Sequence, residues 1–167
     1  MILKNGFEDV KNFSDTLNEK KSRNMKNTFF GDYNCMGYAT NTFGWACPYD
    51  TEQEGEDLFD YGCGNYESNE KAELLTEKML RDFKGKLRRI KTLDEVKEGE
   101  HGILFKCGDD DFHFIKYFPE SKRFYHKTGS LRIKRISKEE ALADTWHSSY
   151  RRDKYDSKTI MFAMNDE

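Results

Sequence analysis

Hydrophobic positions along this chain follow a helical period in its first half and a two-residue period in its second half. Before position 31 the apolar residues recur every three or four positions, at Phe7, Val10, Phe13 and Leu17. This spacing predicts one amphipathic helix packed on the outside of the domain. From Cys35 the same spacing resumes in a short helix, and Gly44 is its expected end.

The stretch 45–64 is rich in acidic residues and indicates a loop. A longer helix is predicted after it, with Asn69 as its cap and Gly85 as its stop. The apolar stripe expected to bind this helix to the core consists of Ala72, Leu75, Met79 and Phe83, broadened by Leu74 and Leu80.

After Gly85 the period falls towards two, which predicts strands over 87–91, 103–105, 112–118, 123–127, 131–136 and 159–164. Residues 119–122 indicate a turn that joins two of these strands as a hairpin. Capping sequences at Thr92 and Ser137 predict two short helices. Helices followed by antiparallel strands predict one α+β domain over 1–167. Its expected parts are a helical segment (1–30), the short helix, acidic loop and long helix (31–85), and an antiparallel sheet of about five strands (86–167).

The composition mainly argues against certain classes of function. The 28 basic and 31 acidic side chains give a formal net charge of −3, so no single-sign field favours nucleic acid or an anionic membrane. No window approaches the ~18 apolar residues of a membrane helix, and the N-terminus has no signal-peptide pattern. We therefore expect a cytoplasmic protein, with signal-independent release as an open possibility. In this setting Cys35, Cys47, Cys63 and Cys107 are expected to be reduced.

Cys35 stands where a short helix is predicted to begin. The positive end of a helix dipole and the unpaired N–H groups there favour a thiolate, so the pKa of Cys35 is expected to fall. The same N–H groups are suited to binding an oxyanion. The alternative is a buried, inert cysteine that packs beside Met36 and Tyr38.

His113 and His126 lie on the two arms of the predicted hairpin, a residue or two out of direct pairing. With Cys35 they form the layout of a Cys–His–His triad, in which the first imidazole accepts the thiol proton and the second orients the first. The face to which each ring points stays open, because a one-residue slip reverses it. A zinc site is a weaker alternative, because no spacing typical of zinc ligands links Cys47, Cys63, His101, Cys107 and His113.

The segment Asp32-Tyr33-Asn34-Cys35-Met36-Gly37-Tyr38-Ala39 resembles the Cys-bearing helix start of papain-like thiol peptidases and amidases of the NlpC and CHAP types. The stretch 93–105 resembles the turn and strand that precede their catalytic histidine, with Gly99-Glu100 in place of a Gly-Asp pair. His113 then matches the strand histidine of these families, and His126 matches the polar third member. The resemblance implies a papain-like fold and a thiol-based reaction on an amide.

Together these inferences predict a hydrolase of an amide bond in a peptide, a protein or another amide. Cys35 is the expected nucleophile, His113 the base and His126 its orienting partner. The Cys35 backbone N–H, helped by Tyr33 or Asn34, is expected to stabilise the oxyanion, while Tyr49 and Tyr61 wall the cleft. No cofactor or metal is expected. Two alternatives stay open: a small binding or inhibitor protein of phage type acting on a host factor, and a thiol acyltransferase or deamidase.

Overall fold

The structure is a computed structural model that describes residues 1–4, 33–42, 44–59, 66–148 and 153–166. The amphipathic helix predicted before position 31 lies outside the described residues, as do Phe43, Tyr61 and Cys63. Among the described helices, none has both the length and the apolar run that crossing a membrane requires.

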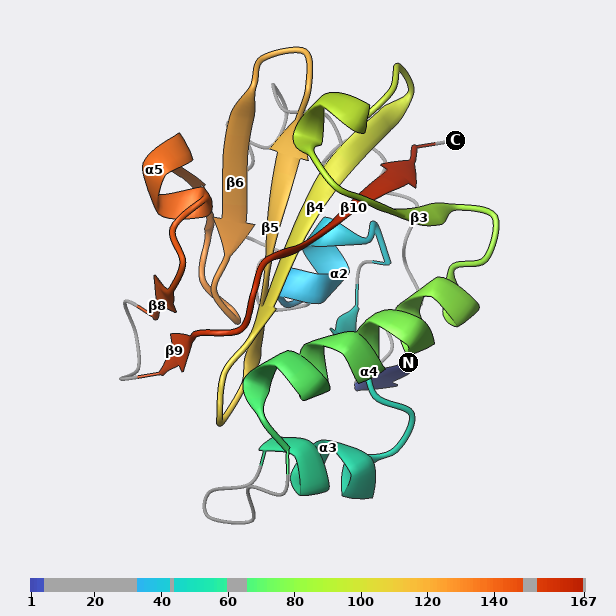
Figure 1. The fold of residues 1–167 in the computed structure, drawn as a ribbon. Helices are drawn as coiled ribbons and strands as arrows, with labels where there is room; N and C mark the ends of the chain where they lie inside the picture. Colours follow the sequence, from blue (N-terminus) through green and yellow to red (C-terminus); the bar gives the residue numbers. More distant parts are fainter. Residues whose placement is uncertain (5–32, 43, 60–65, 149–152, 167) are drawn as a thin grey trace.

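A six-stranded antiparallel sheet forms the centre of the fold (Figure 1). Its strands, in spatial order, are β3 (Leu87–Ile90), β10 (Ile160–Asn165), β4 (Glu100–Cys107), β5 (Phe112–Phe118), β6 (Arg123–Lys127) and β7 (Ile133–Ile136). The chain is thus a mixed helix-and-sheet protein, as predicted, with a sheet close to the expected size. The predicted hairpin is confirmed, since β5 and β6 have the predicted bounds and pair antiparallel.

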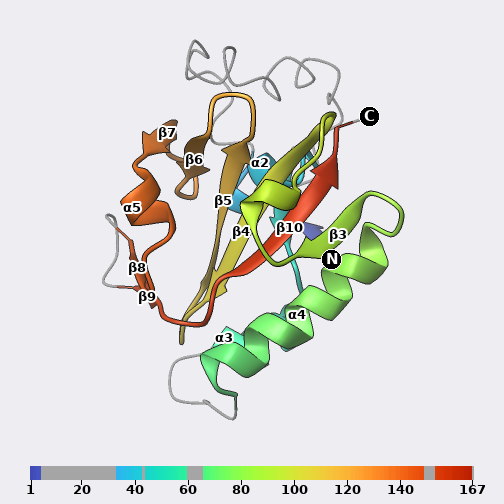
Figure 2. The ribbon, with the colours of Figure 1, turned by 45° about the horizontal axis from the view of Figure 1, so that its top comes forward.

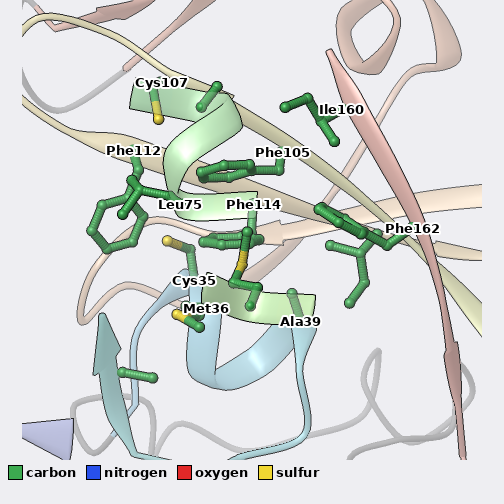
Figure 3. Packing of buried hydrophobic residues seen from close by; sticks show 14 of the residues in the cluster. Cys35, Met36, Ala39, Leu75, Phe105, Cys107, Phe112, Phe114, Ile160 and Phe162 are labelled. Carbon is green, nitrogen blue, oxygen red and sulfur yellow. The ribbon is translucent and has the colours of Figure 1, made fainter. Parts of the chain in front are cut away.

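Alternation along the strands gives the sheet two different faces. One face carries Phe105, Phe114 and Phe162, which pack against α2 (Cys35–Ala39) and α4 (Ser68–Asp82) in the larger core cluster (Figure 3). The other face carries Leu104, Ile115 and Phe124, which pack with the chain after β7. That part contains α5 (Lys138–Ala141), β8 (Trp146–His147) and β9 (Lys154–Tyr155), which lie together beside β6 in Figure 2.

Residues 45–59, the described part of the stretch 45–64, do not form the loop that the composition indicates. They contain β2 (Trp45–Cys47), which pairs with β1 (Ile2–Lys4), and α3 (Glu52–Phe59). Acidic side chains favour the start of a helix, and Glu52 and Glu54 occupy the first turn of α3. The Thr51 hydroxyl also accepts a hydrogen bond from the Glu54 N–H, at 3.1 Å. The acidic residues therefore begin a helix instead of keeping the segment irregular.

The long helix is confirmed, with its start corrected. Leu75 and Met79 of α4 are buried in the core, as the stripe predicted, and Gly85 follows the helix with φ +84°. Asn69 is not the cap of this helix, because the N-cap position is Glu67 and Asn69 lies in the first turn. The Asn69 side chain instead accepts a hydrogen bond from the Lys158 N–H at 2.7 Å. The capping box at Thr92 is also confirmed, at the short helix η4 (Leu93–Glu95).

Candidate active site

The helix that carries Cys35 is short and is fixed at its start by Asn34. The Asn34 side chain accepts a hydrogen bond from the Gly37 N–H at 3.0 Å, which caps α2. It also binds both backbone groups of Ala46, accepting from its N–H at 3.1 Å and donating to its carbonyl at 2.7 Å. Asn34 therefore joins the start of α2 to β2, and its part in binding an oxyanion stays a prediction. The helix ends at Ala39, before the predicted stop at Gly44.

The Cys35 thiol lies beside the edge of β5. The Phe114 backbone N–H is near enough to the Cys35 thiol to lower its pKa, and Figure 3 shows Cys35 next to Phe114. The ladder between β5 and β6 begins only at Ile115, so this part of β5 lies beyond the β6 pairing. The sulfur thus occupies a place next to the peptide unit that joins His113 to Phe114.

The expected fall in the pKa of Cys35 is wrong. Only 6% of the residue is exposed, and burial raises the pKa of its thiol to about 12, with Asp111 as the next cause. The Phe114 N–H acts in the opposite direction. A helix of five residues aligns few peptide dipoles, so its favourable effect on a thiolate is smaller than the cost of burial. Cys35 is therefore a neutral thiol at pH 7.

His113 and His126 are in direct contact, as the hairpin predicted. His126 pairs with Ile115, which places the two histidines two positions out of register on the sheet face opposite α2. Nε2 of His113 lies 2.9 Å from Nδ1 of His126, and the rings meet at 82°. His113 also stacks on Tyr155, with 5.3 Å between ring centroids. The pair is thus held in a fixed orientation.

Both imidazoles are neutral at pH 7. Burial, and then His126, lower the pKa of His113 to about 3. Burial, and then Lys134, lower the pKa of His126 to about 4. If His113 carries its proton on Nε2 and donates it to His126, then Nδ1 of His113 is a lone-pair acceptor. No described residue is hydrogen-bonded to that Nδ1.

A cavity of about 390 Å³ brings Cys35 and His113 to one space, together with Asp111 and Thr128. A second cavity of about 270 Å³ is lined by His113, His126 and Trp146, among other residues. Both cavities share His113, Thr128, Ser148 and Tyr155 in their walls. Among the described residues no hydrogen bond joins the Cys35 sulfur to His113. The two groups therefore line one cavity without a hydrogen bond between them.

The remaining predicted residues are divided between the cavity and the core. Tyr49 lines the larger cavity and packs edge-on against Phe112, with 6.4 Å between ring centroids. Tyr33 is fully buried in a separate aromatic cluster with Tyr125. Tyr61 lies outside the described residues.

Sequence reasoning missed several residues of the cavity wall, among them Trp45, Asp111, Gly129 and Tyr155. Asp111 carried a signal, because it directly precedes the strand that holds His113. The others come from segments that only tertiary packing brings to the site. In the described segments no group of three or more His, Cys, Asp or Glu is arranged to hold a metal ion. No disulfide links Cys35, Cys47 and Cys107.

Comparison with known proteins identified no relative of this chain. The chain matches no protein-family model, and neither a curated protein nor a solved structure matches it.

Proposed function

We propose that this protein is a thiol-dependent hydrolase of amide bonds, with Cys35, His113 and His126 as its reactive centre in a papain-like arrangement. One observation carries the proposal. The Cys35 thiol shares a cavity with the imidazole of His113, whose Nε2 lies 2.9 Å from Nδ1 of a second imidazole, His126. A nucleophile, a base and an orienting group in this order are the parts that acyl transfer through a thiol requires.

In the proposed reaction the Cys35 sulfur attacks the carbonyl carbon of the amide while Nδ1 of His113 takes the thiol proton. The carbon–nitrogen bond then breaks, and His113 returns the proton to the leaving amine. Water attacks the thioester in the second half, giving one proton to His113, and the acid is released as the proton returns to the sulfur. His126 holds the Nε2 proton of His113 throughout and so keeps the reactive tautomer.

The neutral resting state has a consequence for this mechanism. A thiol whose pKa is about 12 and an imidazole whose pKa is about 3 form no ion pair before the substrate binds. Proton transfer must therefore accompany attack. The backbone N–H of Phe114, which acts to lower the pKa of the thiol, stabilises negative charge as it develops on the sulfur.

The experiment is to trap the acyl group with 4-nitrophenyl acetate, a small activated ester that needs no known binding specificity. We expect release of 4-nitrophenolate and an acetyl group on Cys35, located by peptide mass spectrometry. Cys35→Ser should lose the adduct. Cys47→Ser is the matched control, because Cys47 lines the same cavity and is also buried.

The outcomes separate the candidate functions. Slow release of acetate from Cys35 supports a hydrolase, whereas faster release to an added amine supports a transferase on the same thiol. Acetylation of Cys47 in preference to Cys35, or no adduct on the folded protein, contradicts the proposal and favours a binding protein.

A further inference from the structure

Lys127 is a buried lysine that holds the segment before Cys35. It follows His126 on β6, and its side chain points to the opposite face of the sheet. Its Nζ donates hydrogen bonds to the carbonyls of Tyr33 and Gly129 and lies over the Tyr33 ring, 4.7 Å from the centroid. Tyr33 lies two residues before Cys35, and Gly129 lines the cavity. One side chain thus ties β6 to the start of α2 and to the cavity wall.

Lys116 makes the corresponding connection at the other end of α2. It stands three residues after His113 on β5, on the face that packs against α2. Its Nζ donates to the Tyr38 carbonyl at 3.3 Å and to Oδ1 of Asn41 at 2.6 Å. Tyr38 belongs to the last turn of α2, and Asn41 follows the helix with φ +57°. Lys116 and Lys127 are both fully buried.

We propose that Lys116 and Lys127 are positioning residues, one at each end of α2, that hold the Cys35 thiol in the cavity it shares with His113. This inference rests on the proposed function. Each lysine stands on the same strand as one of the two histidines, so the strand that fixes a histidine also fixes one end of the nucleophile helix.

Chemistry explains why lysine occupies these positions. Lysine Nζ has at least two N–H donors whether it is charged or neutral, so one side chain can donate to two oxygen atoms at once. A helix of five residues has too few internal hydrogen bonds to hold its own position, so external contacts must do so. An apolar side chain at either position would fill the space but would remove these donors from the carbonyls of Tyr33, Gly129 or Tyr38.

The test measures the rate of Cys35 alkylation by iodoacetamide at pH 7.5 in the full chain. The variants are Lys116→Met and Lys127→Met, each made with and without His113→Ala. If the lysines act through the Cys35–His113 pair, each should slow alkylation about tenfold when His113 is present. In the His113→Ala background, each lysine substitution should change the alkylation rate by no more than about twofold. If the lysines have a purely structural role, each substitution should slow alkylation by the same factor with and without His113→Ala.

Two further variants keep the test decisive. Lys71→Met is the matched control, because Lys71 is also buried and binds two carbonyls, Gly108 at 3.1 Å and Asp109 at 3.0 Å, from α4. It should lower the melting temperature but leave the rate within about twofold. Asn41→Gly suits the left-handed backbone and removes only the side-chain acceptor of Lys116. If the lysine variants fail to fold, a His113-dependent loss of rate in Asn41→Gly supports the inference, and an unchanged rate overturns it.

Different results contradict the positioning role of the lysines and the proposed function. Equal alkylation rates in the wild-type protein and His113→Ala contradict the proposed function, and the positioning role with it. A His113-dependent rate that survives in both folded lysine variants contradicts the positioning role alone.

Discussion

Cys35, His113 and His126 illustrate how burial sets the charge of individual side chains. Each loses water on folding, so each favours its neutral form, and the pKa of the thiol rises while that of each imidazole falls. A buried lysine needs oxygen atoms in place of water, and Lys127 has them in two carbonyls.

The pH dependence of Cys35 follows from its raised pKa. In the folded protein we expect its alkylation by iodoacetamide to keep rising through pH 10, because the pKa is raised to about 12. In urea, where burial is lost, the same residue should react faster at pH 8 and level off above its ordinary pKa of about 8.5. Peptide mass spectrometry of samples quenched at each pH measures both curves. A folded-state curve that levels off below pH 8 would show that the thiol is activated at rest.

The histidine pair predicts a loss of stability in mild acid. Unfolded histidines have a pKa near 6.5, whereas both folded values are lower, so the unfolded chain binds more protons as the pH falls. The free energy of unfolding should therefore decrease from about pH 6.5 towards pH 4, by up to about 1.4 kcal/mol per pH unit for each histidine.

Urea unfolding at several pH values measures this loss. His126→Gln removes one titrating group and should make the decrease in this range shallower. An equally steep decrease in the variant would mean that other groups cause it.

Among the elements, α2 depends on a close approach to the segment before β2. A Cβ atom on Gly37 would lie 2.1 Å from the carbonyl oxygen of Gly44, which is backbone and cannot rotate away. Gly37→Ala should therefore destabilise the protein by about 1–3 kcal/mol or more. Gly44→Ala is the control, because its Cβ would meet only the end of the Leu3 side chain, at 3.1 Å. Denaturant unfolding of both variants checks the difference, and equal losses would contradict this packing.

Helices and strands were predictable where the local hydrophobic pattern and the turn residues beside it indicated the same structure. The alternation in 112–118 and 123–127, with a turn between, defined β5 and β6 with the observed bounds. The same hairpin predicted the contact of His113 with His126, since the turn fixes the register. β2 was missed because its partner β1 lies more than 40 residues away in the sequence, and no local signal marks that pairing.

At the scale of the whole molecule, the site depends on packing that the sequence does not display. The pKa of Cys35 was mispredicted because the depth at which α2 packs on the sheet is a tertiary property. Lys116 and Lys127 resemble ordinary polar positions in a strand, yet both are fully buried against α2. Spacing along the chain therefore located the candidate chemistry, while the environment of those groups came only from the folded structure.

The most direct test of the central claim is the rate at which 4-nitrophenyl acetate acylates Cys35 in the wild-type protein, His113→Ala and His126→Ala. If His113 accepts the thiol proton, its removal should lower the rate by about 100-fold or more, because that is the usual contribution of a general base. Removal of His126 should lower the rate less, since the imidazole of His113 stays but loses the partner that fixes its tautomer. Rates equal to that of the wild-type protein in both variants, with unchanged melting temperatures, would contradict a reactive centre formed by Cys35, His113 and His126.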